Sequence, residues 1–163
     1  FDLVFLPGVG SFDKVIENLN KINLIHQLKK IYNVKNTYLI GICVGMQILF
    51  DKSEEGKLDG LGLIPGNVKK FISTESQAGL HMGWNEIYTK KFKNFDNKKF
   101  YFAHNYYVEC NEKHIISTST HLTEFPTIVQ NKNIIGIQFH PEKSHKNGIN
   151  LINFLLNNIV NVN

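Results

Sequence analysis

The chain has 163 residues, 42% of them hydrophobic and 20% charged, a composition that fits one folded domain with its own core. Its net charge is +4, but all 18 basic residues are scattered lysines, which argues against a surface that binds nucleic acid. No stretch reaches the ~18 apolar residues that a membrane span needs, and no secretory signal opens the chain. Two cysteines make no disulfide framework, and no metal-ligand spacing or nucleotide fingerprint occurs. We therefore expect a cytoplasmic protein without metal or cofactor.

The first third of the sequence predicts a parallel α/β arrangement. A buried strand at residues 3–6 is closed by a tight loop at residues 7–10, and a second buried strand covers residues 38–42. Between them, one helix from about Asp13 has an apolar stripe formed by Val15, Ile16, Leu19, Ile22, Leu28 and Ile31. A strand, a helix and a strand in this order imply a crossover connection and a parallel sheet. Because Phe1 and Asp2 already fit the first strand, we expect that an N-terminal piece is missing.

The remainder predicts added strands and a closing helix, with no sign of a second domain. A loop-rich stretch at residues 56–66 is followed by short β-like runs, some expected to be antiparallel, at residues 68–72, 101–108, 115–118, 127–130 and 134–139. A short helical run is expected at residues 44–50 and a final helix near residues 149–159. The apolar face of that final helix consists of Leu151, Ile152, Leu155, Leu156 and Ile159. We treat residues 1–163 as a single domain.

Cys43 is the candidate nucleophile. It follows a predicted strand, precedes a predicted helix, and has glycines two residues away on either side, at Gly41 and Gly45. This is the arrangement of a nucleophile elbow, in which small neighbours let backbone segments approach a strained turn. A helix that starts at the sulfur would favour a thiolate, and the N–H of Val44 would be free to bind an oxyanion. The alternative is that Cys43 is an ordinary buried core residue.

A base for this cysteine is available at the end of the last predicted strand. His140 is followed by Pro141, which ends the strand, and then by Glu142. In an extended segment, residues two apart point the same way, so both side chains would meet one site, with Glu142 orienting the imidazole. A lone His-Pro-Glu sequence is often a surface turn. In combination with the elbow, it predicts a Cys-His-Glu triad.

With these residues, the chain resembles the class I glutamine amidotransferases, and within that class it looks like the glutaminase subunit of imidazole glycerol phosphate synthase. The resemblance covers nearly the whole chain. It implies a flavodoxin-like α/β fold, with a mainly parallel sheet flanked by helices and some added antiparallel strands. The matching segments, in order, are PGVG at residues 7–10, GICVGMQ at 41–47, SEEG at 53–56, GLGLIPG at 60–66, HMGWNE at 81–86, YFAHNYY at 101–107 and QFHPEKS at 138–144.

The resemblance implies a role for each residue of the candidate site. Cys43 would attack the side-chain amide of glutamine and form a γ-glutamyl thioester. His140 would carry the proton to the departing ammonia and later activate water, held by Glu142. The N–H of Val44 would supply one oxyanion donor, and a rearranged loop would supply the second at Val9 or Gly10. The residues expected to bind glutamine are Gln47, His104, Asn105 and Tyr106.

The resemblance also implies a partner, a (β/α)₈-barrel cyclase subunit that receives the ammonia in a heterodimer for histidine biosynthesis. Its docking face would include Met82, Trp84, Asn85 and Lys143. The sequence departs from the family pattern at two places. The opening strand and helix of the family are absent, which puts the independent folding of the chain as written in question. Asn105 stands where relatives usually have Ser, which puts the pose of the substrate in question.

Other functions compete with this interpretation. A paralogous glutaminase would feed ammonia to a synthetase that amidates a sugar of a surface polysaccharide, and some segments look similar to that subgroup. A non-catalytic docking subunit would keep the fold without turnover, but the intact Cys43, His140 and Glu142 argue against it. A cysteine peptidase could use a similar elbow, but Gln47 and the loop at residues 7–10 favour glutamine.

Overall fold

The computed structural model describes residues 3–160, and its centre is a five-stranded mixed sheet. In spatial order, the strands are β1 (Leu3–Gly8), β2 (Tyr38–Cys43), β10 (Ile134–Ile137), β9 (Thr123–Asn131) and β8 (Ile115–His121). The first three strands in this order run parallel to one another, and β9 and β8 are added antiparallel. The parallel pairing expected for the first two strands is confirmed, although β1 extends into the expected loop and ends at Gly8. Phe1 and Asp2 lie outside the described residues.

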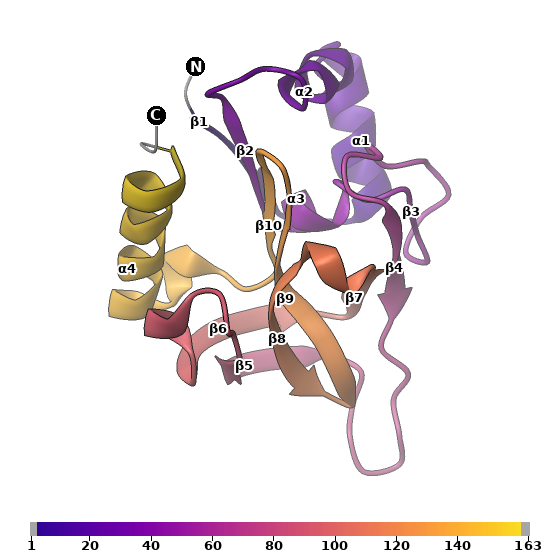
Figure 1. Cartoon of the computed structure of the whole chain (residues 1–163). Helices are drawn as coiled ribbons and strands as arrows, with labels where there is room; N and C mark the ends of the chain where they lie inside the picture. The colour runs from indigo at the N-terminus through magenta and orange to yellow at the C-terminus, as the bar shows by residue number, and fades with distance from the viewer. Residues whose placement is uncertain (1–2, 161–163) are drawn as a thin grey trace.

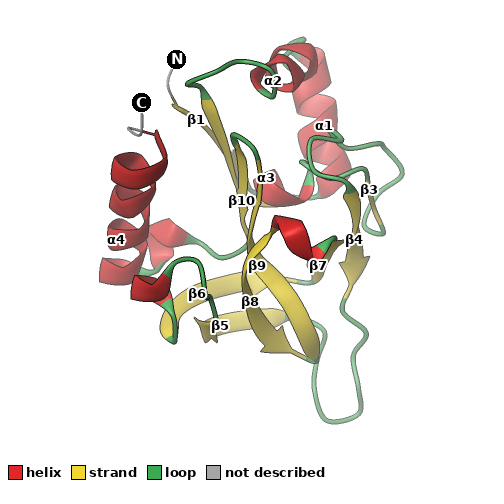
Figure 2. Cartoon of the chain, viewed as in Figure 1, coloured by secondary structure: helices red, strands yellow, loops and turns green. Residues whose placement is uncertain are grey.

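Helices cover the two faces of this sheet (Figures 1 and 2). One face carries α1 (Phe12–Lys21), α2 (Ile25–Ile31) and the short α3 (Val44–Gln47). The other face carries α4 (His145–Leu155), which continues into a π-helical turn (Leu156–Val160). Each face has its own core, because Phe12, Ile16 and Met46 belong to one apolar cluster and Leu151 and Leu155 to the other. Ile159, which was expected on the apolar face of the final helix, is not among the residues whose burial the structure describes.

The single long helix expected from Asp13 was wrong. The chain leaves the helical path at Asn23, which has a positive φ of 54°, and α2 begins two residues later. Ile22 consequently leaves the buried stripe and is exposed. Asparagine tolerates the left-handed conformation that commonly ends a helix. The helical run expected at residues 44–50 is likewise shorter, since α3 ends at Gln47.

Two smaller sheets complete the fold, and their positions differ from the sequence prediction. The run expected at residues 101–108 is divided at Asn105 into β6 (Lys98–His104) and β7 (Tyr106–Cys110), which belong to different sheets. β6 pairs with β5 (His81–Ile87), a strand that the sequence did not predict. β7 pairs with β4 (Gly66–Lys70), and β4 with the short β3 (Lys52–Ser53). Three 3₁₀ turns are η1 (Lys93–Phe95), η2 (Glu112–His114) and η3 (Pro141–Lys143).

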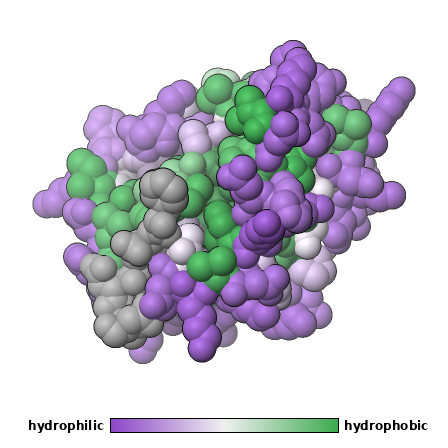
Figure 3. Space-filling model, turned by 90° about the horizontal axis from the view of Figure 1, so that it is seen from above, coloured by the Kyte–Doolittle hydropathy of each residue, from purple (hydrophilic) through white to green (hydrophobic). Residues whose placement is uncertain are grey.

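On the face seen from above in the orientation of Figure 1, hydrophobic residues come to the surface between hydrophilic borders (Figure 3). Phe5 on β1 and Ile149 on α4 are exposed, and both line a shallow hollow between the two elements. Within residues 3–160, no helix combines the length and the apolar character that crossing a membrane requires.

Candidate active site

Cys43 ends β2 in a backbone conformation that few non-glycine residues adopt. Its φ is 55° and its ψ is −114°, so the turn is strained in the way expected of a nucleophile elbow. The flanking glycines allow this turn. A Cβ on Gly45 would lie 1.9 Å from the carbonyl oxygen of Leu6, and one on Gly41 would lie 2.3 Å from that of Gly45. β1, β2 and α3 therefore meet at a distance that only glycine permits.

The sulfur of Cys43 is buried, and its surroundings disfavour the thiolate. Burial raises the pKa of the thiol to about 11, and the hydrogen bond from the N–H of Val44 offsets this only in part. The negative charges of Glu142 and Glu55 raise the pKa further, while Lys143 lowers it. Burial thus opposes the thiolate that was expected at a helix start. A four-residue helix is too short to outweigh the loss of solvation.

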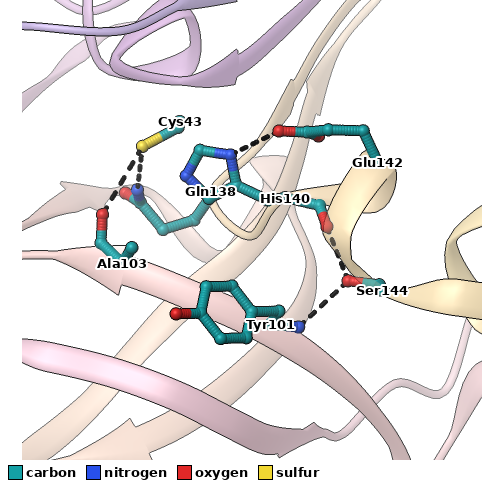
Figure 4. A network of polar contacts seen from close by, with 7 residues as sticks. All are labelled: Cys43, Tyr101, Ala103, Gln138, His140, Glu142 and Ser144. Atoms are coloured by element: carbon teal, nitrogen blue, oxygen red, sulfur yellow. Dashed lines mark hydrogen bonds and ion pairs between the residues drawn. The ribbon is translucent and has the colours of Figure 1, made fainter.

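His140 and Glu142 form a pair beside this cysteine. Nδ1 of His140 lies 2.7 Å from Oε1 of Glu142, and the ring lies between that carboxylate and the sulfur (Figure 4). The contact was expected, but its local structure was not. β10 ends at Ile137, and Glu142 lies in the turn η3, not in an extended segment. Because the neutral imidazole donates from Nδ1 to the carboxylate, Nε2 is left as the basic nitrogen.

The strand β6 holds the cysteine and the histidine in one frame. The thiol of Cys43 donates to the carbonyl of Ala103 at 3.9 Å, and the N–H of His140 donates to the carbonyl of Tyr101 at 2.9 Å. Ser144 reinforces the frame, since its hydroxyl donates to the carbonyl of His140 and accepts from the N–H of Tyr101 (Figure 4). The thiol proton is therefore directed at β6 in this state.

Two buried glutamines connect the elbow to the segment after β6. Nε2 of Gln47 donates to the carbonyl of Tyr106 at 3.1 Å and to Oε1 of Gln138 at 3.2 Å. Nε2 of Gln138 lies 3.9 Å from the sulfur of Cys43. Sequence reasoning assigned no role to Gln138 or Ser144. The two-residue spacing that linked His140 to Glu142 also leads back to Gln138, and this signal could have found it.

The expected glutamine-binding segment and oxyanion loop lie around the elbow. The side chain of His104 is buried, so only its backbone is available to a substrate, whereas Asn105 is exposed. Gly8 pairs with Cys43 in the β1–β2 register, which places the following Val9 and Gly10 beside the turn. Val9 is 88% exposed and Gly10 has a φ of 107°. No contact fixes their N–H groups on the sulfur in the described structure.

The residues expected at a docking face lie on and near β5. Met82 and Trp84 are 62% and 47% exposed, and the ring of Trp84 contacts Tyr101 and His145. Lys143 is exposed over the ring of Tyr101, 5.8 Å from its centroid. Asn85 differs, because its side-chain amide turns inward to His81 and to the carbonyl of Thr120.

A strained cysteine on a strand–helix turn, next to a histidine held by a carboxylate, defines an acyl-transfer site of the thiol type. The family model of glutamine amidotransferase class-I matches residues 2–158. The chain belongs to this family, and its architecture is the class I glutamine amidotransferase fold.

Relatives with a more specific name cover most of the chain. The imidazole glycerol phosphate synthase subunit HisH 2 of Methanococcus maripaludis is 45% identical over 159 residues, which are 93% of this chain and 79% of that protein. The subunit HisH of Leptospira borgpetersenii is 44% identical over 158 residues, 91% of this chain and 78% of its own length. The subunit HisH of Thermotoga maritima is 42% identical over 93% of this chain and 74% of its own length.

Solved structures agree with the fold. A glutamine amidotransferase crystal structure matches with a TM-score of 0.71 at 14% identity, covering 96% of this chain and 79% of the other. Another glutamine amidotransferase, from Thermotoga maritima, matches with a TM-score of 0.60 at 17% identity, covering 96% of this chain and 63% of the other. At these identities, the similarity concerns the fold alone.

Proposed function

We propose that the chain is the glutaminase subunit of an imidazole glycerol phosphate synthase, which hydrolyses glutamine to glutamate and ammonia for histidine biosynthesis. The observation that carries this proposal is the placement of the His140 ring between the Glu142 carboxylate, at 2.7 Å, and the sulfur of a strained Cys43. The relatives named HisH support the choice of pathway. The reaction takes place, as the sequence predicts, in the cytoplasm.

The chemistry follows from the residues at the elbow. Nε2 of His140 takes the thiol proton, and the sulfur of Cys43 attacks the carbonyl carbon of the glutamine amide. The oxyanion is bound by the N–H of Val44 and by a second N–H at Val9 or Gly10. The C–N bond then breaks, ammonia leaves with the proton from His140, and a thioester remains. Water, deprotonated by His140, hydrolyses this thioester to glutamate and free thiol.

The resting state of the site predicts that the free chain is a poor glutaminase. The thiol points at Ala103, its pKa is raised to about 11, and the loop at residues 7–10 has not brought an N–H to the sulfur. We propose that docking of a (β/α)₈-barrel cyclase on Met82, Trp84 and Lys143 completes the site and receives the ammonia. Exposed tryptophan is a typical interface anchor. Asn85 would support this docking face from the protein interior, because its side-chain amide turns inward.

Replacement of the nucleophile tests the proposal. In the Cys43→Ala variant, glutamine-dependent product formation by the complex should disappear, while synthesis from added ammonium salt by the partner should continue. Cys110→Ala is the matched control, since this second cysteine lies at the end of β7 and should leave both activities unchanged. Glutamine-dependent turnover in the Cys43→Ala complex would contradict the proposal.

A paralogous glutaminase that supplies a sugar-amidating synthetase is the second candidate. The relatives of Methanococcus maripaludis and Vibrio vulnificus carry the name HisH 2, and such numbering indicates a second subunit of this type. Expression of the chain with its partner in a histidine auxotroph that lacks its own glutaminase subunit separates the two. Growth on glutamine as nitrogen donor supports the histidine pathway, whereas failure to rescue growth, with activity restored only by a different cyclase-like partner, supports the paralogue.

A further inference from the structure

A continuous chain of side-chain hydrogen bonds leads from β5 to the candidate glutamine site. Nδ2 of Asn85 lies 3.2 Å from Nε2 of His81, and Nδ1 of His81 lies 3.0 Å from Nε2 of His104. Nδ1 of His104 in turn lies 2.7 Å from the carbonyl oxygen of Tyr106. That carbonyl also accepts from Gln47, whose amide reaches Gln138 beside the nucleophile.

The acceptors at the two ends fix the direction of every bond in this chain. The carbonyl of Tyr106 can only accept, so Nδ1 of His104 carries a proton, and its Nε2 must accept from Nδ1 of His81. Nε2 of His81 then accepts from the Asn85 amide, whose second proton goes to the carbonyl of Thr120 at 2.9 Å. The arrangement is satisfied only when both imidazoles are neutral Nδ1–H tautomers.

We propose that His81 is a positioning residue for glutamine binding, which acts through His104 to hold the carbonyl of Tyr106, and hence Gln47, in place. This inference rests on the proposed function, because the segment from His104 to Tyr106 is the expected binding segment for glutamine. The alternation along β5 is consistent with it. His81 is buried, while its neighbour Met82 is exposed on the opposite face of the strand. β5 therefore carries a candidate docking residue on its outer face and the first imidazole of the hydrogen-bond series on its inner face.

The environment of the pair favours the neutral rings that the bonding requires. His81 stacks on Phe102 at 4.6 Å between ring centroids and on His121 at 4.4 Å, and Phe125 contacts both His81 and His104. Burial lowers the pKa of His81 to about 4 and that of His104 to about 3. At neutral pH, the series of hydrogen bonds through His81 and His104 is therefore intact, because the charged imidazolium forms do not compete with the neutral rings.

Steady-state glutaminase kinetics of the complex test the inference. His81→Leu removes the donor to His104, and the KM for glutamine should rise about tenfold while kcat changes less than about threefold, because uniform binding is lost. His81→Asn places an amide N–H near the position of Nδ1 and should recover most of the affinity. His121→Phe is the matched control. The substitution keeps an aromatic ring stacked on His81 and removes only the bonds of His121 to Gln77 and Ala78. These bonds lie outside the series of hydrogen bonds that starts at Asn85, so KM and kcat should both stay at the wild-type values.

A structural measurement accompanies the kinetics. Nitrogen chemical shifts of the imidazoles at pH 7 should report Nδ1–H tautomers for both His81 and His104. An Nε2–H tautomer at either ring, or an unchanged KM in His81→Leu with an active wild type, would overturn this inference alone. Equal losses in His81→Leu and His121→Phe would also overturn it, since they would indicate a general packing effect. A wild-type complex without glutaminase activity would overturn the proposed function, and this inference with it.

Discussion

Glu142 holds His140 from the solvent side: the carboxylate side chain is 58% exposed, whereas the imidazole that it contacts is 9% exposed. The exposed carboxylate of Glu142 thus orients the buried imidazole of His140, and its main effect is on the tautomer of that imidazole rather than on the stability of the protein. Replacement of Glu142 should therefore change catalysis more than stability.

Glu142→Gln should therefore reduce the kcat of glutamine hydrolysis by about 10²-fold, because the amide no longer enforces the Nδ1–H tautomer of His140. The melting temperature should stay close to that of the wild type. Glu17→Gln on the exposed surface of α1 is the control and should leave kcat unchanged. A kcat of wild-type size in Glu142→Gln would show that this carboxylate does not orient the base.

Gly45→Ala tests how closely β1 and α3 approach each other at the elbow. A methyl group at this position would lie 1.9 Å from the carbonyl oxygen of Leu6, so β1 and α3 must separate, and the free energy of unfolding should fall by about 3 kcal/mol or more. Gly10→Ala is the matched comparison. Its φ of 107° also disfavours alanine, but the space around it is open, so the cost should be only about 1–2 kcal/mol. Urea unfolding measures both, and equal losses would contradict the close contact.

The reactivity of Cys43 should depend on pH in the free chain. Since burial raises its pKa to about 11, alkylation by iodoacetamide should accelerate steadily from pH 8 upward, without a plateau near pH 8 or 9. The raised pKa also means that burial of the neutral thiol contributes stability below pH 9, which is lost between pH 9 and about 11. A Cys110→Ala background isolates the signal, because Cys110 has a similarly raised pKa. Full alkylation rates already at pH 7 would contradict the resting arrangement.

Acid should weaken the fold through the buried histidine pair. The pKa values of His81 and His104 are lowered to about 4 and about 3, so their contribution to stability is complete above pH 6.5 and is lost as the pH falls toward those values. The other histidines that face this pair are His121 and His140.

Urea unfolding between pH 7 and pH 4 measures this loss, whose slope can reach about 1.4 kcal/mol per pH unit for each histidine. His81→Asn should flatten the pH profile, whereas His26→Asn on the exposed surface of α2 should not. If both variants keep the wild-type profile, another group is responsible for the acid sensitivity.

The elbow and the pair of His140 and Glu142 were accessible from the sequence because each depends on local spacing. Gly41, Cys43 and Gly45 lie within one turn, and His140 and Glu142 are two residues apart, so the contact survives the exchange of an extended segment for the turn η3. The parallel pairing of β1 and β2 followed from similar local patterns, whereas the place of β10 beside β2 was not predicted.

The parts that the sequence did not predict depend on pairing between distant segments. β5 has no strong alternation of apolar residues, and it becomes a strand because β6 pairs with it over its whole length. Asn105 offers no obvious break signal, yet the chain changes sheets there. The bonds from His81 to His104 and from Gln47 to Gln138 join residues 23 and 91 positions apart. Such contacts are set by tertiary packing, which single-sequence patterns do not encode.

Trapping the acyl-enzyme tests the central claim most directly. The complex is mixed with glutamine carrying an isotope label in its γ-carbon, quenched in acid during turnover, and digested for peptide mass analysis. We predict a labelled γ-glutamyl adduct on the peptide that contains Cys43, and none on the peptide that contains Cys110. Steady release of ammonia without a labelled Cys43 peptide, or undiminished turnover in Cys43→Ser, would contradict a thioester at this residue.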